Sequence, residues 1–202
     1  MGELIEDIAL RGRSFVFRDR PEAGKLLAEV LLDYEASDAI VLAIPAGGVP
    51  VAFEIARRLR LLMDVAIVRK IQIPGNTEAG FGAMGPDGEV VFNERLLRTL
   101  RLTEKEIQQQ VDKTMGVIKE RNKLYRGSRP FPDLSGKTVI FADDGLASGY
   151  TMSEAVKFVM RKDAKKIIVA VPTASESSIN LILPLVDELY CLNIRGYPFA
   201  VA

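Results

Sequence analysis

Residues 139–151 read VIFADDGLASGYT, and this stretch decides the fold. An apolar run ends at two adjacent acids, Asp143 and Asp144, and a loop of small residues then leads into a helix near Thr151. An apolar run without polar alternation predicts a strand that is buried on both faces of a parallel sheet. Ligands of such sheets bind beyond the carboxyl ends of the strands, so the loop from Asp143 to Thr151 is the first candidate site.

The rest of the chain alternates short apolar runs with helical periodicity and contains no internal repeat or long linker. This pattern predicts one domain, residues 1–202, with a doubly wound, mainly parallel α/β sheet. The glycine-rich stretch at about 72–93 contains two short apolar runs separated by Pro-Asp-Gly, which predicts a β-hairpin flap. We expect strands over 39–44, 64–69, 137–142, 166–171 and 187–192, and helices over 20–34, 49–60, 103–126, 151–161 and 175–183.

Composition excludes several classes of protein. The 27 basic and 27 acidic residues cancel, which argues against a nucleic-acid partner because such proteins usually carry a basic excess. The chain has no histidine, so histidine triads and imidazole zinc sites are excluded. No apolar stretch approaches membrane-spanning length, and the single Cys191 lies in an apolar run. We therefore expect a cytoplasmic protein without a membrane partner, in which Cys191 is buried and reduced.

The loop after the two acids has the composition of an anion site. The small residues Gly145, Ala147, Ser148 and Gly149 let a ligand approach the backbone N–H groups, with a helix dipole behind them. Ser148 and Thr151 add hydroxyl donors. Asp143 and Asp144 repel phosphate, so their expected partners are sugar hydroxyls, or Mg²⁺ reached through those hydroxyls or water. The alternative is an ordinary strand-to-helix turn whose aspartates cap the helix.

This stretch resembles the 5-phosphoribosyl-1-diphosphate (PRPP) signature of type I phosphoribosyltransferases, which is a hydrophobic strand, two acids and a small-residue loop ending in Gly-x-Thr. Gly145 departs from the signature, since an aliphatic residue is usual there. The segments FRDRPEAGKLLAEVL (17–31), LYRG (124–127) and VDELYCLN (186–193) look like one uncharacterised bacterial and archaeal subgroup of the family. The resemblance therefore covers nearly the whole chain.

The resemblance implies a magnesium-dependent transferase of nucleotide metabolism. Its reaction would displace pyrophosphate from PRPP with a nitrogen nucleophile, with inversion at the anomeric carbon. By resemblance, Asp143 and Asp144 bind the ribose hydroxyls and act as catalytic residues together with Lys70. The residues that would bind the 5-phosphate are Ala147, Ser148, Gly149, Tyr150 and Thr151.

A second loop, IPAGGVP (44–50), follows the first expected strand. In the resembled family a loop at this place receives pyrophosphate, which would involve Ala46, Gly47 and Gly48. The two glycines allow left-handed backbone conformations, and their N–H groups can face an anion. Close relatives often carry Arg before the glycines, so Ala46 removes one cationic contact. The alternative is a glycine turn that serves packing alone.

Arg69 and Lys70 are expected to end the strand at 64–69 on the same sheet edge, where they would counter pyrophosphate as similar pairs do in the family. The alternative is ordinary solvated charge. The segment that follows has the composition of a mobile lid, and the family closes a flexible loop over its reaction centre here. Arg18 and Arg20 could also bring cations to the site, although charges at a helix start are more often solvated.

Ala147 bears on the accepting base. Enzymes of the resembled family that act on 6-oxopurines carry an acid at this point, so Ala147 disfavours hypoxanthine, guanine and xanthine. Adenine and orotate enzymes lack the acid too. The family builds a small hood from terminal segments, here the N-terminal stretch and the tail at about 193–202, where Tyr197 or Phe199 could stack on a base. Dimers are common among the relatives, which allows a homodimer.

Two other functions compete with the transferase. A protein of the same fold could sense PRPP or a nucleotide without catalysis, and pyrophosphate release with a panel of bases distinguishes the two. A dinucleotide-binding enzyme would need G-x-G-x-x-G in its first strand-to-helix turn, and residues 44–50 do not match it.

Overall fold

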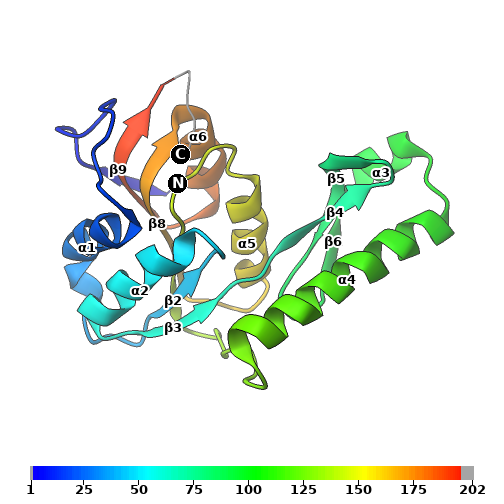
Figure 1. Ribbon diagram of the computed structural model, residues 1–202, viewed down its shortest axis with the longest axis horizontal. Helices are drawn as coiled ribbons and strands as arrows, with labels where there is room; N and C mark the ends of the chain where they lie inside the picture. The colour runs from blue at the N-terminus through cyan, green and yellow to red at the C-terminus, as the bar shows by residue number, and fades with distance from the viewer. Residues whose placement is uncertain (1, 197–202) are drawn as a thin grey trace. The chain divides into compact units, whose positions relative to one another are not determined.

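The computed structural model describes residues 2–196, apart from the side chains of residues 77 and 78 (Figure 1). The chain packs as two compact units. One comprises the described parts of Met1–Val65 and Pro132–Ala202, and the other is Ala66–Phe131. The expectation of a single domain over the whole chain stays a prediction.

The first unit is built on a six-stranded sheet in which every pair of neighbouring strands is parallel. The strand order is β1-β9-β8-β7-β2-β3. The central strands are buried along almost their whole length, as expected for a sheet covered on both faces. The strands are β1 (Glu3–Glu6), β2 (Ile40–Ala43), β3 (Leu62–Val65), β7 (Thr138–Ala142), β8 (Lys166–Ser175) and β9 (Glu188–Arg195).

Helices cover both faces of this sheet. Figure 1 shows α1 and α2 together on one side, and α5 and α6 on the other. Phe141, Phe158, Leu27 and Ile55 are among the side chains fully buried between the layers. The doubly wound α/β fold is therefore confirmed. The helical elements are α1 (Arg20–Val30), η1 (Leu32–Tyr34), α2 (Gly48–Leu59), α5 (Tyr150–Met160), α6 (Glu176–Ile182) and η2 (Leu183–Leu185).

The second unit contains an antiparallel sheet in the order β4 (Arg69–Ile73), β5 (Asn76–Met84) and β6 (Val90–Phe92). The predicted hairpin is formed by β5 and β6, whose turn places Gly88 at φ +86°. A short helix, α3 (Glu94–Leu100), follows, and then the 23-residue α4 (Glu104–Arg126). A capping box of Thr103 and Glu106 opens α4, at the residue where the helix was expected to begin.

Two expectations about the strands were wrong. The strand expected at 64–69 ends at Val65, and Arg69 and Lys70 instead begin β4 of the antiparallel sheet. The N-terminal stretch was assigned to the hood, but Glu3–Glu6 extends the main sheet as edge strand β1 beside β9. Four-residue strands at a sheet edge give a short sequence signal, and the apolar residues at 66–68 concealed the break between β3 and β4.

Cys191 lies inside β9 and is fully buried, as expected. Burial raises the pKa of its thiol to about 12, so the thiol stays protonated. Among the described helices, none combines the length and apolar composition needed to cross a bilayer.

Candidate functional site

Two loops of the first unit meet at the carboxyl end of the parallel sheet. Strands β2 and β7 end together, with Ala43 paired to Ala142. The amide of Ile44 then donates to the Ala142 carbonyl over 2.9 Å. Gly48 packs so closely on this strand end that an added Cβ would lie 2.8 Å from the Cα of Asp143. The 44–48 loop and the loop after β7 are thus side by side.

Serines at the start of α6 hold the loop after β7 from behind. Ser175 Oγ donates to the carbonyl of Ala147, and Ser178 Oγ donates to the carbonyl of Leu146, both over 2.8 Å. In a planar trans peptide the C=O of one residue and the N–H of the next point in opposite directions. The N–H groups of Ala147 and Ser148 therefore point away from the serines. Both residues are exposed, so these N–H groups are available to a ligand.

The loop continues into the N-terminus of α5 without a side-chain cap. Gly149 occupies the N-cap position at φ +73°, a conformation that favours glycine. Tyr150 and Thr151 follow as exposed residues of the first turn, whose N–H groups lack intrahelical partners. One expected donor is excluded, because the Leu146 amide already donates to the Thr173 carbonyl over 2.9 Å. The N–H groups available to a ligand in this loop consequently begin at residue 147.

The two acids at the end of β7 lie in different environments. Asp143 is the more enclosed, and burial raises the pKa of its carboxyl from the ordinary 3.8 to about 8. A hydrogen bond of 2.8 Å from the Asp144 amide opposes the rise, and repulsion by the Asp144 carboxylate adds to it. Near neutral pH the protein without ligand therefore holds Asp143 largely protonated.

Asp144 pairs with a basic residue from the start of α1. The Nε and Nη2 atoms of Arg20 reach its Oδ2 atom at 2.8 Å and 2.7 Å. Gly47 lies against the same carboxylate, because a Cβ at this position would overlap the carboxylate atoms. Asp144 thus joins three segments that are far apart in sequence: the start of α1, the 44–48 loop and the end of β7.

The expected geometry of the glycine pair was wrong. Gly47 has helical dihedral angles, φ −61° and ψ −38°, and neither Gly47 nor Gly48 has a positive φ. The amide of Gly48 donates to the Ile44 carbonyl over 3.0 Å, so it does not face an anion. Glycine is required here because two backbone segments and the Asp144 carboxylate approach closely. The peptide bond between Pro45 and Ala46 is cis.

The carboxylates are consistent with Mg²⁺ only as an ion delivered with a substrate. Within residues 2–196, no three Asp, Glu, Cys or His side chains gather closely enough to hold a metal ion. Asp143 and Asp144 offer oxygen atoms, which hard cations prefer, but two acids leave most of the coordination sphere to other ligands. Phosphate oxygens, sugar hydroxyls or water would have to supply the remainder.

The remaining predicted site residues do not belong to these two loops. Arg69 and Lys70 are part of the second unit, where burial, followed by repulsion from Arg121, lowers the pKa of Arg69. Tyr197 and Phe199, the predicted base-stacking residues, lie outside the described residues. Sequence reasoning missed Ser175 and Ser178, although a serine three residues before another at a helix start is a capping pattern that could have found them.

Residues between β1 and α1 cover the end of β9, which is the place expected for a hood. The amide of Gly12 donates to the Ile194 carbonyl over 3.0 Å, and Asn193 Nδ2 donates to the Arg13 carbonyl over 2.9 Å. This segment therefore lies at the carboxyl edge of the sheet. A hood formed by the N-terminal stretch stays a prediction for this segment, whereas Glu3–Glu6 belongs to the main sheet.

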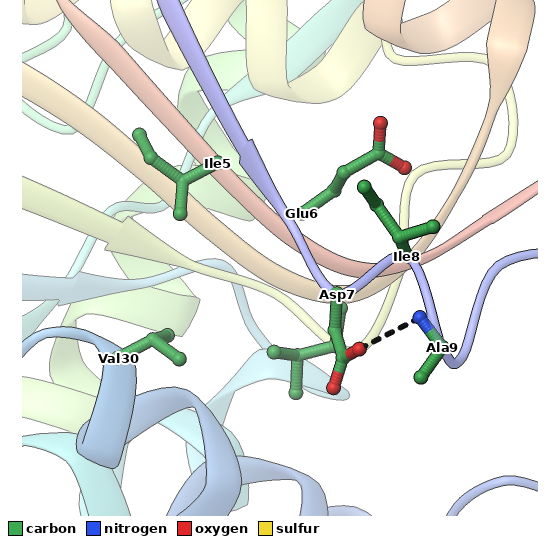
Figure 2. A pocket seen from close by; sticks show the side chains of 7 residues that line it. Ile5, Glu6, Asp7, Ile8, Ala9 and Val30 are labelled. Atoms are coloured by element: carbon green, nitrogen blue, oxygen red, sulfur yellow. Dashed lines mark hydrogen bonds between the residues drawn. The ribbon is translucent and has the colours of Figure 1, made fainter.

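A separate hollow of about 360 Å³ runs along β1 (Figure 2). Its two acids are already engaged: Asp7 accepts from the Ala9 amide, and Glu6 pairs with Arg11. The remaining lining is aliphatic, so the hollow lacks a convergent set of polar groups among the described residues. Its lining comprises Ile5, Glu6, Asp7, Ile8, Ala9, Val30 and Leu192.

Comparison with known proteins gives consistent results. A family model described as the phosphoribosyl transferase domain matches residues 20–188. The Mycobacterium tuberculosis protein Rv0571c, whose name assigns it provisionally as a phosphoribosyl transferase, is 34% identical over 186 residues, which are 92% of this chain and 42% of that protein. The chain thus spans less than half the length of the curated relatives it matches.

Solved structures extend the comparison. The protein TT1426 from Thermus thermophilus is 36% identical with a TM-score of 0.79, covering 92% of this chain and 88% of that one. A hypoxanthine phosphoribosyltransferase from Staphylococcus aureus shares the fold with a TM-score of 0.52 at 13% identity, covering 90% of this chain and 75% of that one.

Proposed function

Since the chain belongs to the phosphoribosyl transferase domain family, we propose that it transfers the 5-phosphoribosyl group of PRPP to a nitrogen nucleophile and releases pyrophosphate. One observation carries the proposal. The exposed loop after β7 turns its N–H groups outward at residues 147 and 148, directly beside two acids with unlike environments. The phosphate oxygens, which accept hydrogen bonds, would meet these N–H groups. The sugar hydroxyls, which donate hydrogen bonds, would meet the two acids a few residues away.

The 5-phosphate is assigned to the loop and the first turn of α5. Outward N–H groups and the positive end of the helix dipole favour a dianion, and the hydroxyls of Ser148 and Thr151 can donate to it. The serines behind the loop fix it before a ligand arrives, which reduces the ordering cost of binding. The assigned residues are Ala147, Ser148, Gly149, Tyr150 and Thr151.

The ribose 2- and 3-hydroxyls are assigned to Asp143 and Asp144. Carboxyl oxygens accept hydrogen bonds from hydroxyls in either protonation state, whereas an ionised carboxylate would repel a phosphate. Mg²⁺ carried by the substrate would neutralise pyrophosphate charge, and these two acids are the protein groups that would reach it through the ribose hydroxyls or water. In the protein without ligand, Arg20 and Gly47 hold the Asp144 carboxylate in place until the sugar binds.

Pyrophosphate is assigned to the 44–48 loop, with Arg69 and Lys70 as its cations. Ala46 and Gly47 offer backbone to the leaving group, while Gly48 contributes by close packing because its amide is already bonded. The part of Arg69 and Lys70, with Lys70 as a catalytic group, rests on the resemblance and stays a prediction.

The reaction forms a bond from the nucleophile nitrogen to the anomeric carbon as the carbon–oxygen bond to pyrophosphate breaks. The departing oxygen takes the bonding electrons, and the nitrogen loses its proton to solvent or buffer. Alignment of the two reactants and stabilisation of the leaving pyrophosphate supply the acceleration. Ala147 offers no acid or base to a purine N7, which disfavours 6-oxopurines as acceptors.

A turnover screen tests the proposal. PRPP with Mg²⁺ is incubated with a panel of nucleobases and amines, and pyrophosphate release is measured for the wild-type protein and for Asp144→Asn. We expect release with at least one acceptor, and strong loss in the variant with little change in its unfolding midpoint. PRPP binding by calorimetry without any release would instead identify a sensor. Normal turnover by Asp144→Asn would refute the ribose assignment.

A further inference from the structure

We propose that Arg20 is a substrate-positioning residue, which holds Asp144 in the protein without ligand and pairs with the pyrophosphate group of PRPP once the substrate is bound. The inference rests on the proposed function and adds a cation from the start of α1 to its pyrophosphate site.

The contact itself is well defined. Two nitrogens of Arg20 reach one oxygen of Asp144, at 2.8 Å and 2.7 Å, across 124 positions of sequence. The arginine is anchored because α1 begins at Arg20, and the Asp19 side chain caps that helix by accepting from the Glu22 amide. A guanidinium on a capped helix start can change its partner while its backbone stays in place.

The neighbouring loop needs a cation that it does not possess. None of residues 44–50 is charged, and Ala46 stands at the position next to the two glycines. Gly47 lies against the Asp144 carboxylate that Arg20 holds. The guanidinium and the proposed pyrophosphate loop therefore contact the same carboxylate, that of Asp144. Arg20 pairs directly with Asp144, an acid of the proposed site.

An exchange of partners is physically inexpensive. The Arg20 side chain is 51% exposed, and ion pairs with such exposure contribute little to folding. When ribose hydroxyls and a substrate-borne cation engage Asp144, its charge no longer requires arginine. A diphosphate offers paired oxygens that match the planar fork of a guanidinium. The stronger partner would then draw Arg20 from Asp144 toward the 44–48 loop.

Binding of two product-like probes separates this role from a purely structural one. Calorimetry measures Mg²⁺-pyrophosphate and ribose 5-phosphate with the wild type, Arg20→Ala and Arg20→Lys. We expect Arg20→Ala to weaken pyrophosphate binding about ten- to hundredfold, the cost of one charge-assisted contact, and to change ribose 5-phosphate binding by less than about threefold. Arg20→Lys should fall between, because lysine keeps the charge but lacks the fork.

Arg18→Ala is the matched control. Arg18 lies two residues away with its side chain 78% exposed, and it pairs with Asp19 and Glu22 rather than with the site. The control removes the same charge and should leave both affinities at their wild-type values. Thermal unfolding of each variant verifies that the fold is retained.

Three results would overturn the inference. Unchanged pyrophosphate affinity in Arg20→Ala would show that the arginine does not meet this group. Equal weakening of both probes would show that Arg20 acts only by orienting Asp144, and tighter binding of both would make it a blocking counter-ion. Absence of binding by the wild type would refute the proposed function itself, and the inference with it.

Discussion

Replacing Asp143 by Asn is expected to change how the stability of the protein depends on pH. Burial raises the pKa of this carboxyl in the folded protein from 3.8 to about 8, whereas in the unfolded chain it titrates normally. Between these two values the folded state holds a proton that the unfolded state releases. The contribution of Asp143 to stability is therefore fully present below about pH 4 and is lost as the pH rises toward 8.

The magnitude follows from the two pKa values. One proton taken up on folding changes the free energy of unfolding by about 1.4 kcal/mol per pH unit. Between pH 5 and 7, which lie inside the interval, the wild type should lose about 2–3 kcal/mol from this group. Asn cannot titrate and keeps an oxygen that can accept from the Asp144 amide, so Asp143→Asn should lack this loss.

Urea unfolding at pH 5, 6, 7 and 8 measures the effect. The difference in unfolding free energy between Asp143→Asn and the wild type should shift in favour of the variant by about 2–3 kcal/mol from pH 5 to 7. Asp33→Asn makes the same chemical change at an exposed position and should follow the wild-type profile. A difference that stays constant with pH would show that Asp143 is ionised in the folded protein, and the reasoning from burial would fail.

Other substitutions test the architecture of the site. Gly47→Ala should displace the Asp144 carboxylate and weaken Mg²⁺-PRPP binding, whereas Gly116→Ala, whose Cβ meets open space, should leave binding unchanged; calorimetry distinguishes them. Ser178→Ala should lower the free energy of unfolding by about 1–3 kcal/mol and loosen the phosphate loop, measured by urea unfolding and amide exchange. Thr151→Val should weaken ribose 5-phosphate binding by about 1–3 kcal/mol. An unchanged dissociation constant would contradict the assignment of the 5-phosphate to residues 147–151.

The sheet could be predicted because its strands are buried on both faces. Their apolar runs are not interrupted by polar residues, and the helices between them show helical periodicity. The types of the elements and their order can therefore be predicted directly. Strand prediction from apolar runs fails where a strand is buried on one face only or is very short. Strand β1 has four residues at a sheet edge, and β4 opens with Arg69 and Lys70, whose charges suggested a strand end rather than a strand start.

The chemistry of the phosphate loop was predictable for a different reason. The two acids, the small residues and the helix start are contiguous, so their relation is fixed by a few bonds of chain. Sequence reasoning did not predict which amides are occupied. The Leu146 and Gly48 amides are bonded to carbonyls, and the partners of such groups depend on the register of neighbouring strands and turns.

Gly47 shows most clearly the difference between what local sequence can predict and what depends on contacts between distant segments. The sequence allowed a left-handed backbone at Gly47, yet its dihedral angles suit any residue. Its requirement comes from Asp144, whose carboxylate fills the space where a Cβ would lie, while Arg20 holds that carboxylate from α1. A conformational reason for glycine can be judged from local sequence, but a steric reason depends on atoms contributed by distant segments. The contact of Arg20, Asp144 and Gly47 is of the second kind, because its three residues come from distant segments of the chain.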